Sequence, residues 1–318
     1  MEYRYLGNSG LQVSVVGLGT NNFGGRMDFE AAQPVIHKCL DMGITFFDTA
    51  DVYGGRGKSE EILAPALKDV RHDVVIATKS YSPMGEGPYW SGASRKYLSD
   101  ALDACLRRLD TDYIDFYQMH RWDSHTPIDE TLRFLDDAVS SGKVRYIGNS
   151  NYTGWQVVES AWAAKTQRLT PFIGAQNAYS LLDRDVEKEL VPACLKYGLG
   201  LIPYSPLAGG FLTGKYRPDQ APPEGARLSS QQGGRILNEG NFNSLIKLEK
   251  FAGDHGHSMV DLAVGWLASQ PVVSSVIAGA STPEQVEQNC KAGEWRLTAA
   301  ELTEIDEIMG VNQPSRRG

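Results

Sequence analysis

The chain has 318 residues, 42% of them hydrophobic, which is enough for one large domain or two ordinary ones. Its formal net charge is −8 and its basic residues are scattered, which argues against a nucleic-acid-binding surface. It has no long apolar run and no apolar signal core after Met1, so the sequence predicts neither a membrane span nor secretion by that route.

The four cysteines lie far apart and form no Cys-x-x-Cys pair. Such spacing is typical of buried thiols in a reducing compartment, so we expect a cytoplasmic protein without a cysteine-based metal or redox site. The cysteines are Cys39, Cys105, Cys194 and Cys290.

The chain begins with two short runs around a Gly/Asn turn at 7–10, which predict a β-hairpin. Strand-like and helix-like segments then alternate. Strands are predicted at 15–20, 44–47, 74–79, 113–120, 144–148, 172–176, 199–204 and 274–278. Helices are predicted near 31–42, 59–67, 98–109, 127–139, 155–164, 186–196, 243–254, 258–269, 283–291 and 299–309. A Gly/Pro/Ser-rich stretch at 206–242 reads as a long insertion.

Eight strand–helix units follow the hairpin. This count favours an α/β fold, a single (β/α)8 TIM barrel with an N-terminal β-hairpin and extra helices, spanning 1–318 as one domain. The alternative is a six-stranded open sheet with a second domain. The even spacing of the units and the absence of a linker favour the barrel.

An apolar run, Ile44 to Phe47, ends in Asp48, and Tyr53 follows in the next loop. A carboxylate is costly to bury unless it is paired, so we expect a cation beside it. The next two strands end in Lys79 and His120, and the carboxyl ends of barrel strands meet on one face.

These four side chains make a chemically coherent set. A nearby ammonium lowers the pKa of a tyrosine from its usual ~10, so Lys79 and Asp48 would tune Tyr53 as a general acid. His120 would orient a substrate carbonyl. Each residue alone has an ordinary explanation as a cap, a packed aromatic or a solvated strand end, but their joint placement favours catalysis.

A metal site is the competing interpretation, because His120, Asp123 and His125 are possible ligands. His125, however, lies in a loop just before a helix cap, and the later strand ends carry Asn, Gln, Tyr and Gly. We therefore expect no metal, and a metal-dependent hydrolase is the less favoured function.

A phosphate site is predicted at the last strand end. Gly17-Leu-Gly19 is no Gly-x-Gly-x-x-Gly fingerprint followed by a helix, so it does not indicate a Rossmann unit. After Gly279, by contrast, Thr282 is expected to cap a helix, with Pro283 first in the helix and Gln285 completing a capping box. Such an N-terminus attracts phosphate, although a plain capped helix explains it equally well.

Other segments offer groups that suit a nicotinamide cofactor. Lys215, Arg217 and Arg227 in the insertion add positive charge near the phosphate site, unless they are solvated surface cations. Tyr204 offers an aromatic face for the ring. Hydrogen bonds to its carboxamide are expected from Ser150, Asn151 and Gln176.

With these residues in place, the chain resembles the aldo-keto reductase superfamily over nearly its whole length. It leans toward the branch that includes potassium-channel β-subunits and bacterial relatives. The motifs that carry the resemblance are Phe47-Asp48-Thr-Ala-Asp51-Val-Tyr53-Gly, Thr78-Lys79, Asp115-Phe-Tyr-Gln-Met-His120, Gly148-Asn-Ser150-Asn151, Gln176-Asn-Ala-Tyr179 and Tyr204-Ser-Pro-Leu-Ala-Gly209.

The resemblance implies an NADPH molecule extended over the carboxyl face of the barrel. It also implies direct hydride transfer to an aldehyde or ketone, or the reverse, with Tyr53 as the proton donor. The positions that match the family's cofactor site are Gly19, Thr20, Asp48, Ser150, Asn151, Gln176, Tyr204, Ser205, Pro206, Leu207, Gly209, Leu212, Lys215, Arg227, Gly279, Ser281, Thr282, Gln285, Gln288 and Asn289.

Two features depart from many relatives. Where those carry a basic residue for a 2′-phosphate, this chain has Ser281-Thr282, so Arg227 with the helix amides would substitute. NADPH is still expected over NADH. The chain also stops soon after the last predicted helix. We therefore expect Phe23, Trp90, Trp122 and the 206–242 insertion, together with Tyr53 and His120, to shape the substrate pocket, and Asp51 to be a loop residue.

The sequence thus predicts a cytoplasmic reductase that acts on a small-molecule carbonyl, with no nucleic-acid or membrane partner. The competing function is a cofactor-binding regulatory subunit with vestigial catalysis. The natural substrate, the direction of reaction and whether the chain forms a homo-oligomer stay open.

Overall fold

A computed structural model describes residues 1–311 except 219, 224 and 230–232. Eight parallel strands follow one another around a barrel in the order β10-β3-β4-β5-β6-β7-β8-β9. They are β3 (Val16–Gly19), β4 (Phe46–Asp48), β5 (Val75–Ser80), β6 (Ile114–Met119), β7 (Val144–Ser150), β8 (Gly174–Gln176), β9 (Gly200–Leu201) and β10 (Val276–Gly279). Bridges from Leu201 to Val273 and from Tyr204 to Ile277 close the ring, which confirms the predicted (β/α)8 barrel.

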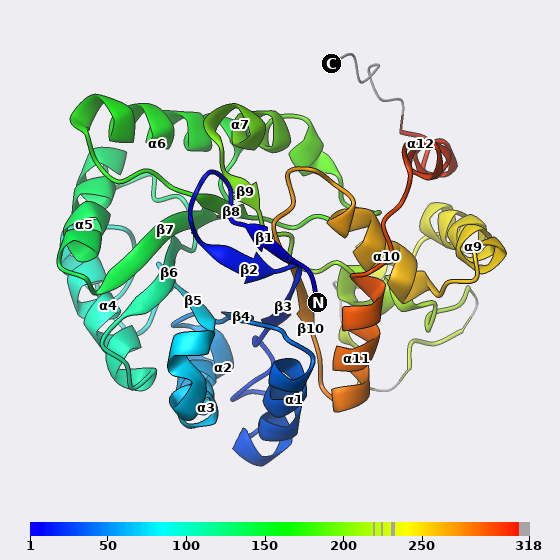
Figure 1. Cartoon of the computed structure of the whole chain (residues 1–318), viewed down its shortest axis with the longest axis horizontal. Helices are drawn as coiled ribbons and strands as arrows, with labels where there is room; N and C mark the ends of the chain where they lie inside the picture. The colour runs from blue at the N-terminus through cyan, green and yellow to red at the C-terminus, as the bar shows by residue number, and fades with distance from the viewer. Residues whose placement is uncertain (219, 224, 230–232, 312–318) are drawn as a thin grey trace.

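Helices surround the strands, as Figure 1 shows. They are α1 (Phe29–Asp41), α2 (Tyr53–Arg56), α3 (Lys58–Leu67), α4 (Arg95–Arg108), α5 (Ile128–Ser140), α6 (Gly154–Gln167), α7 (Leu190–Tyr197), α8 (Gly233–Ile236), α9 (Glu239–Asp254), α10 (Met259–Ala268), α11 (Pro283–Ala292) and α12 (Ala299–Ile308). Short 3-10 helices are η1 (Lys68–Asp73), η2 (Asp185–Glu187), η3 (Ala208–Thr213) and η4 (Arg227–Ser229).

Helix α4 illustrates how the sequence produces these helices. The Ser94 side chain accepts a hydrogen bond from the Tyr97 N–H and satisfies one of the free amides of the first turn. Leu98, Leu102 and Cys105 recur at helical spacing and are buried against the barrel. All four cysteines are free thiols and buried, as predicted.

The N-terminal hairpin closes one end of the barrel. Strand β1 (Tyr3–Tyr5) pairs antiparallel with β2 (Gln12–Ser14), and the hairpin lies across the strands in Figure 1. Leu6 and Val13 are fully buried in a cluster with Phe46 and Phe116 of the barrel interior. Because this end is filled, access to the barrel is left to the carboxyl ends of the strands.

Three local predictions need correction. Helix α5 begins at Ile128 with Pro127 as its cap, not at Pro127 with Thr126 as the cap. Strand β9 covers only two residues because Pro203 has no N–H to donate to the ladder. The 206–242 insertion contains η3, η4, α8 and the start of α9, and five of its positions lie outside the described residues.

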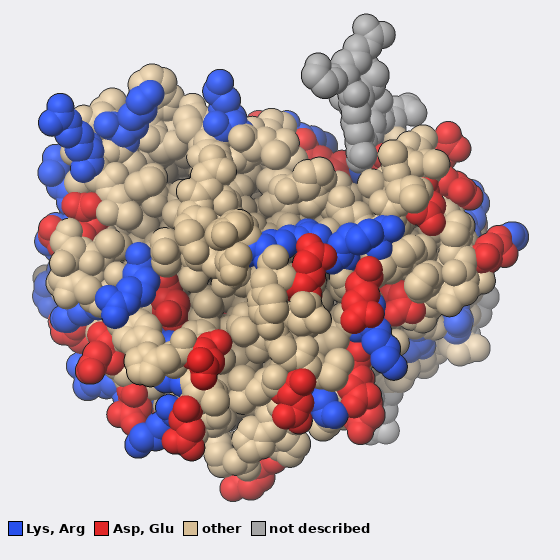
Figure 2. All heavy atoms as spheres, in the orientation of Figure 1, with Lys and Arg blue, Asp and Glu red and all other residues tan. Residues whose placement is uncertain are grey.

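The surface is mixed in charge. Figure 2 shows Lys and Arg side chains interspersed with Asp and Glu over the hairpin-side face. Among the described residues, no helix has the length and apolar character that crossing a membrane requires.

Candidate active site

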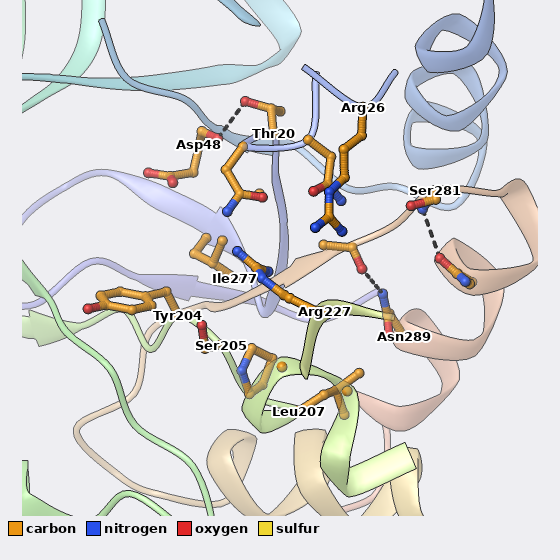
Figure 3. A pocket seen from close by; sticks show the side chains of 18 of the residues that line it. Thr20, Arg26, Asp48, Tyr204, Ser205, Leu207, Arg227, Ile277, Ser281 and Asn289 are labelled. Atoms are coloured by element: carbon orange, nitrogen blue, oxygen red, sulfur yellow. Dashed lines mark hydrogen bonds between the residues drawn. The ribbon is translucent and has the colours of Figure 1, made fainter. Parts of the chain in front are cut away.

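A groove of about 560 Å³ runs across the carboxyl ends of the strands. Tyr53 and His120 line it, and from Asp48 and Tyr204 it extends to Ser281 and Asn289, as Figure 3 shows. The predicted site residues that line it are Gly19, Thr20, Asp48, Tyr53, His120, Ser150, Asn151, Gln176, Tyr204, Ser205, Pro206, Leu207, Gly209, Lys215, Arg227, Gly279, Ser281, Gln285, Gln288 and Asn289. Leu212 and Thr282, also predicted, are not among the lining residues.

Asp48 has the buried cation that its position demands. The fully buried Lys79 Nζ donates hydrogen bonds to Asp48 Oδ1 and Oδ2 at 2.8 and 2.7 Å, and to the Thr49 carbonyl at 2.8 Å. Gln176 Nε2 donates to Asp48 Oδ1 at 2.7 Å, and Gln118 Nε2 approaches the same oxygen at 3.4 Å. Groups from β4, β5, β6 and β8 therefore meet at one carboxylate.

Tyr53 begins the short helix α2 directly after this strand end. Lys79 Nζ lies 5.1 Å from the centroid of its ring, and the His120 ring lies edge-on to it with centroids 5.8 Å apart. Gly54 has φ +67°, and a Cβ there would lie 2.9 Å from Lys58 Cβ, so glycine is needed for the turn that holds Tyr53. Four residues distant in sequence thus meet at one end of the groove.

Burial dominates the ionisation of Tyr53. It raises the pKa of Tyr53, and the Lys79 charge only partly offsets the rise. Lys79 acts to lower this pKa, as expected from the sequence, but the net direction is upward, because the cost of burying a phenolate is larger. Burial also works to lower the pKa of Lys79, but Asp48 and Tyr53 outweigh it, so that pKa is raised and the ammonium stays charged.

His120 is held neutral. Burial, followed by the charges of Lys79 and Arg121, lowers its pKa to about 3. Its Nδ1 is buried and has no hydrogen-bond partner within the described part of the chain. A neutral imidazole can donate one hydrogen bond without competing for the reacting proton.

Asn151 organises the next part of the groove. Its Nδ2 donates to the His120 carbonyl and to Ser150 Oγ, both at 3.0 Å, and its Oδ1 accepts from the Tyr204 hydroxyl at 2.7 Å. The side chain expected to meet a carboxamide is therefore already occupied in positioning Tyr204.

The far end is built around the start of α11. Thr282 Oγ1 accepts from the Gln285 N–H at 3.4 Å, so Thr282 is the cap. Gln285 Oε1 accepts from the Ser281 N–H at 2.8 Å (Figure 3). The predicted capping box is thus displaced by one residue, since that side chain bonds Ser281 instead of the Thr282 N–H.

Exposed cations flank this part of the groove. Lys215 and Arg227 line it, whereas Arg217 pairs with Glu249 at 2.8 Å. Arg26 and Arg227 extend toward the groove from opposite sides in Figure 3. Arg26, like Arg121 at the other end, was not predicted. Both follow a strand end by a few positions, which is the signal that would have identified them.

The arrangement fits a nicotinamide dinucleotide. The backbone has positive φ at Ala208, Gly209 and Gly210, a turn that lets main-chain amides approach a phosphate closely. Lys215 and Arg227 stand beside it, and Tyr204 offers an aromatic face at the catalytic end. Polar, cationic and aromatic groups of the kinds that such a cofactor needs therefore line one groove.

A model described as "Aldo/keto reductase family" matches residues 15–309. The chain belongs to this family. Similar relatives include a probable voltage-gated potassium channel subunit beta from Oryza sativa subsp. japonica, 38% identical over 92% of this chain and 91% of the relative. An L-glyceraldehyde 3-phosphate reductase from Escherichia coli (strain K12) is 37% identical over 96% and 92%, and a versiconal hemiacetal acetate reductase from Aspergillus parasiticus is 35% identical over 96% of each chain.

Membership of the aldo/keto reductase family and the reductase names of two relatives support an oxidoreductase that reduces carbonyl groups. Aldo-keto reductases generally use NAD(P)H. The predicted branch is also confirmed, since channel β-subunits and bacterial oxidoreductases are both among the relatives.

The three aromatic residues predicted for the substrate pocket are not among the residues that line this groove. Phe23 is fully buried in the core, so it has no surface to offer a substrate. Trp90, 52% exposed, lines a second cavity beside Asp51. Trp122 packs edge-on against Tyr152 with centroids 5.3 Å apart. The lining residues of the groove also include Asn21, Asn22 and Arg121, which were not predicted.

Asp51 lies in the loop between β4 and α2, as predicted, but its environment is unusual for a loop residue. It is buried, its Oδ2 accepts from the Tyr97 hydroxyl at 3.3 Å, and no described group bonds its Oδ1. Burial, reinforced by the neighbouring Glu60 and opposed by Arg108, raises the pKa of Asp51 to about 7. The free energy of unfolding should therefore depend on the ionisation of Asp51.

The metal interpretation gains no support from this geometry. Across residues 1–311 without the five gaps, no group of three His, Cys, Asp or Glu side chains is arranged to hold a metal ion. His125 is exposed, and the Asp123 carboxylate is occupied with the N–H groups of Ala93 and His125.

Proposed function

We propose that this protein is an NAD(P)H-dependent reductase of aldehydes or ketones in which Tyr53 donates the proton. The observation that carries the proposal is the buried Lys79–Asp48 pair beside Tyr53, at a groove that also presents a neutral His120. Buried charge at such a place is costly, and catalysis gives a reason for it.

The reaction divides between cofactor and protein. The reduced nicotinamide, when bound, supplies a hydride to the carbonyl carbon and is itself oxidised. Tyr53 Oη gives its proton to the carbonyl oxygen, and the C=O double bond becomes a C–O–H single bond. His120 donates a hydrogen bond to the same oxygen and fixes its position.

The pKa directions support this assignment. Because burial raises the pKa of Tyr53, the phenol is protonated at neutral pH and ready to donate. After the transfer, the phenolate faces the Lys79 ammonium, whose own pKa is raised by Asp48 and Tyr53. The charge that develops on Tyr53 in the transition state is thus met by a fixed cation.

The cofactor is proposed to extend from Tyr204, with its ring against that aromatic face, to α11. Its phosphates would meet Lys215, Arg227 and Arg26 along the groove. Three cations exceed what a pyrophosphate alone needs, which favours NADPH over NADH. The adenosine end would lie near Ser281 and Asn289.

Replacing Tyr53 by Phe tests the proposal. The variant keeps the ring and loses the hydroxyl, so reduction of aldehydes should fall by roughly 10²- to 10⁴-fold. NADPH binding, followed by fluorescence, should be retained. Tyr5→Phe is the matched control, because Tyr5 is exposed on the hairpin at the opposite end of the barrel. Undiminished turnover by Tyr53→Phe would overturn the mechanism.

A second candidate function is that of a cofactor-binding regulatory subunit. It is supported by the 38% identity to a probable channel β-subunit. Single-turnover oxidation of bound NADPH by a panel of aldehydes separates the two. Oxidation by any aldehyde supports the reductase. Tight NADPH binding without oxidation by any of them supports the regulatory subunit.

A further inference from the structure

Arg121 occupies the catalytic end of the groove. It follows His120 at the end of β6, and its side chain is exposed while lining the same groove as Tyr53 and Tyr204. Its charge contributes to lowering the pKa of His120 and opposes the burial-driven rise in that of Tyr204. Arg121 therefore lies close to both the proposed carbonyl site and the proposed ring site.

This charge has no partner within the described structure. Asp48 is the one carboxylate among the described lining residues, and Lys79 engages both of its oxygens. Asp183 acts on Tyr204 from nearby but makes no ion pair with Arg121. His120 is neutral and Lys79 is fully buried, so Arg121 is the cation that a bound substrate would meet.

The cofactor's phosphates do not account for Arg121 either. In Figure 3 Arg26 lies on the Ser281 side of the groove, and Arg227 extends across the groove toward Ile277, between Tyr204 and Asn289. Beside Tyr204 the proposed cofactor presents its nicotinamide ring, which carries no phosphate. The positive charge of Arg121 would therefore pair with a group of the substrate and not with a cofactor phosphate.

The geometry points to a carbonyl substrate that carries a carboxylate or phosphate group, bound through Arg121. The inference rests on the proposed function and specifies its substrate class. A guanidinium presents a planar fork that matches either anion, and it stays charged at any working pH. Because His120 and Arg121 line the same groove and the Arg121 charge acts on the His120 ring, the two side chains would hold the carbonyl and the anionic group of one molecule.

Two matched pairs of probes test this inference. Succinic semialdehyde is compared with butanal, and glycolaldehyde phosphate with glycolaldehyde. The wild type should show at least a tenfold higher kcat/KM for the anionic member of one or both pairs. The preference should shrink in 0.5 M NaCl, because the guanidinium is exposed and salt screens it. The pair with the larger preference identifies the anion.

Arg121→Met keeps length and removes charge. It should raise KM for the preferred anionic probe about tenfold with little change in kcat, and raise KM for its neutral partner much less, as lost ground-state binding to the anionic group requires. Arg121→Lys should recover part of the loss. Arg133→Met on the exposed side of α5 is the matched control.

The outcomes separate the two proposals. If the wild type reduces neutral aldehydes as efficiently as anionic ones, or if Arg121→Met impairs both members of a pair equally, the anionic-substrate inference is wrong and the reductase stands. If the wild type reduces none of the four probes, the reductase proposal itself loses its support, and this inference falls with it.

Discussion

Single residues at this site are governed by burial before they are governed by charge. The Lys79 ammonium stands next to Tyr53, yet the pKa of the phenol is raised because a phenolate there would lose its water. The same competition gives the opposite net result for Lys79, whose carboxylate partner lies within hydrogen-bond distance. Residue types in a sequence reveal the charges, but not the depth at which they lie.

Asp51 offers a residue-scale prediction. Below pH 3.8 its carboxyl is protonated in both the folded and the unfolded chain. As pH rises toward 7, the unfolded chain loses this proton while the folded protein keeps it, so folding becomes less favourable. Above pH 7 the penalty is about 4 kcal/mol. Asp51→Asn should therefore stabilise the protein more at pH 8 than at pH 5, by about 3 kcal/mol.

Urea unfolding at the two pH values measures this difference. Exposed Asp112→Asn is the control, because it changes the same functional group without burial. An equal gain from Asp51→Asn at both pH values would contradict the prediction.

At the scale of elements, glycines on the barrel's inner face limit what the strands can carry. A Cβ on Gly148 of β7 would lie 2.7 Å from the Gly174 carbonyl oxygen and would also overlap the Phe116 ring. Gly148→Ala should cost roughly 1–3 kcal/mol by overpacking. Gly253→Ala, in α9 with no atom near its Cβ position, should instead stabilise by about 0.5–1 kcal/mol. Thermal unfolding compares them, and a shift of the same sign in both would refute the packing argument.

The order of the elements could be predicted because the longer helices and most strands carry a clear period, whereas the four-residue helices α2 and α8 are too short to show one and were not predicted. The exact ends of the helices and strands could not be predicted, because a single residue decides where each element begins or stops. Pro127 moved from inside α5 to its cap, and Pro203 cut β9 short. The groove's polar lining followed from the strand ends, since barrel topology brings those ends together. Trp90 was placed wrongly because the direction of the 80–93 loop leaves no trace in composition or period.

At the scale of the whole molecule, cofactor binding should be visible as stability. A ligand at a hundredfold its Kd stabilises the folded state by about 2.7 kcal/mol. We expect NADPH to raise the Tm more than NADH at equal concentration. Arg227→Gln should reduce the shift with NADPH more than the shift with NADH, whereas Arg217→Gln should leave both unchanged, because Arg217 pairs with Glu249. Equal shifts for the two cofactors in the wild type would argue against the NADPH preference.

The meeting of four strands at Asp48 has a consequence for how this protein can diversify. Lys79, Gln118 and Gln176 all approach that carboxylate, so the group beside the proposed proton donor also joins the strands to one another. Replacing the Lys79–Asp48 pair by apolar side chains could stabilise the fold, but it would remove the cation beside Tyr53. Replacing only one member of the pair would leave the other as an unpaired buried charge. New substrates can therefore evolve through exposed positions such as Arg121, while this junction is constrained twice, by folding and by chemistry.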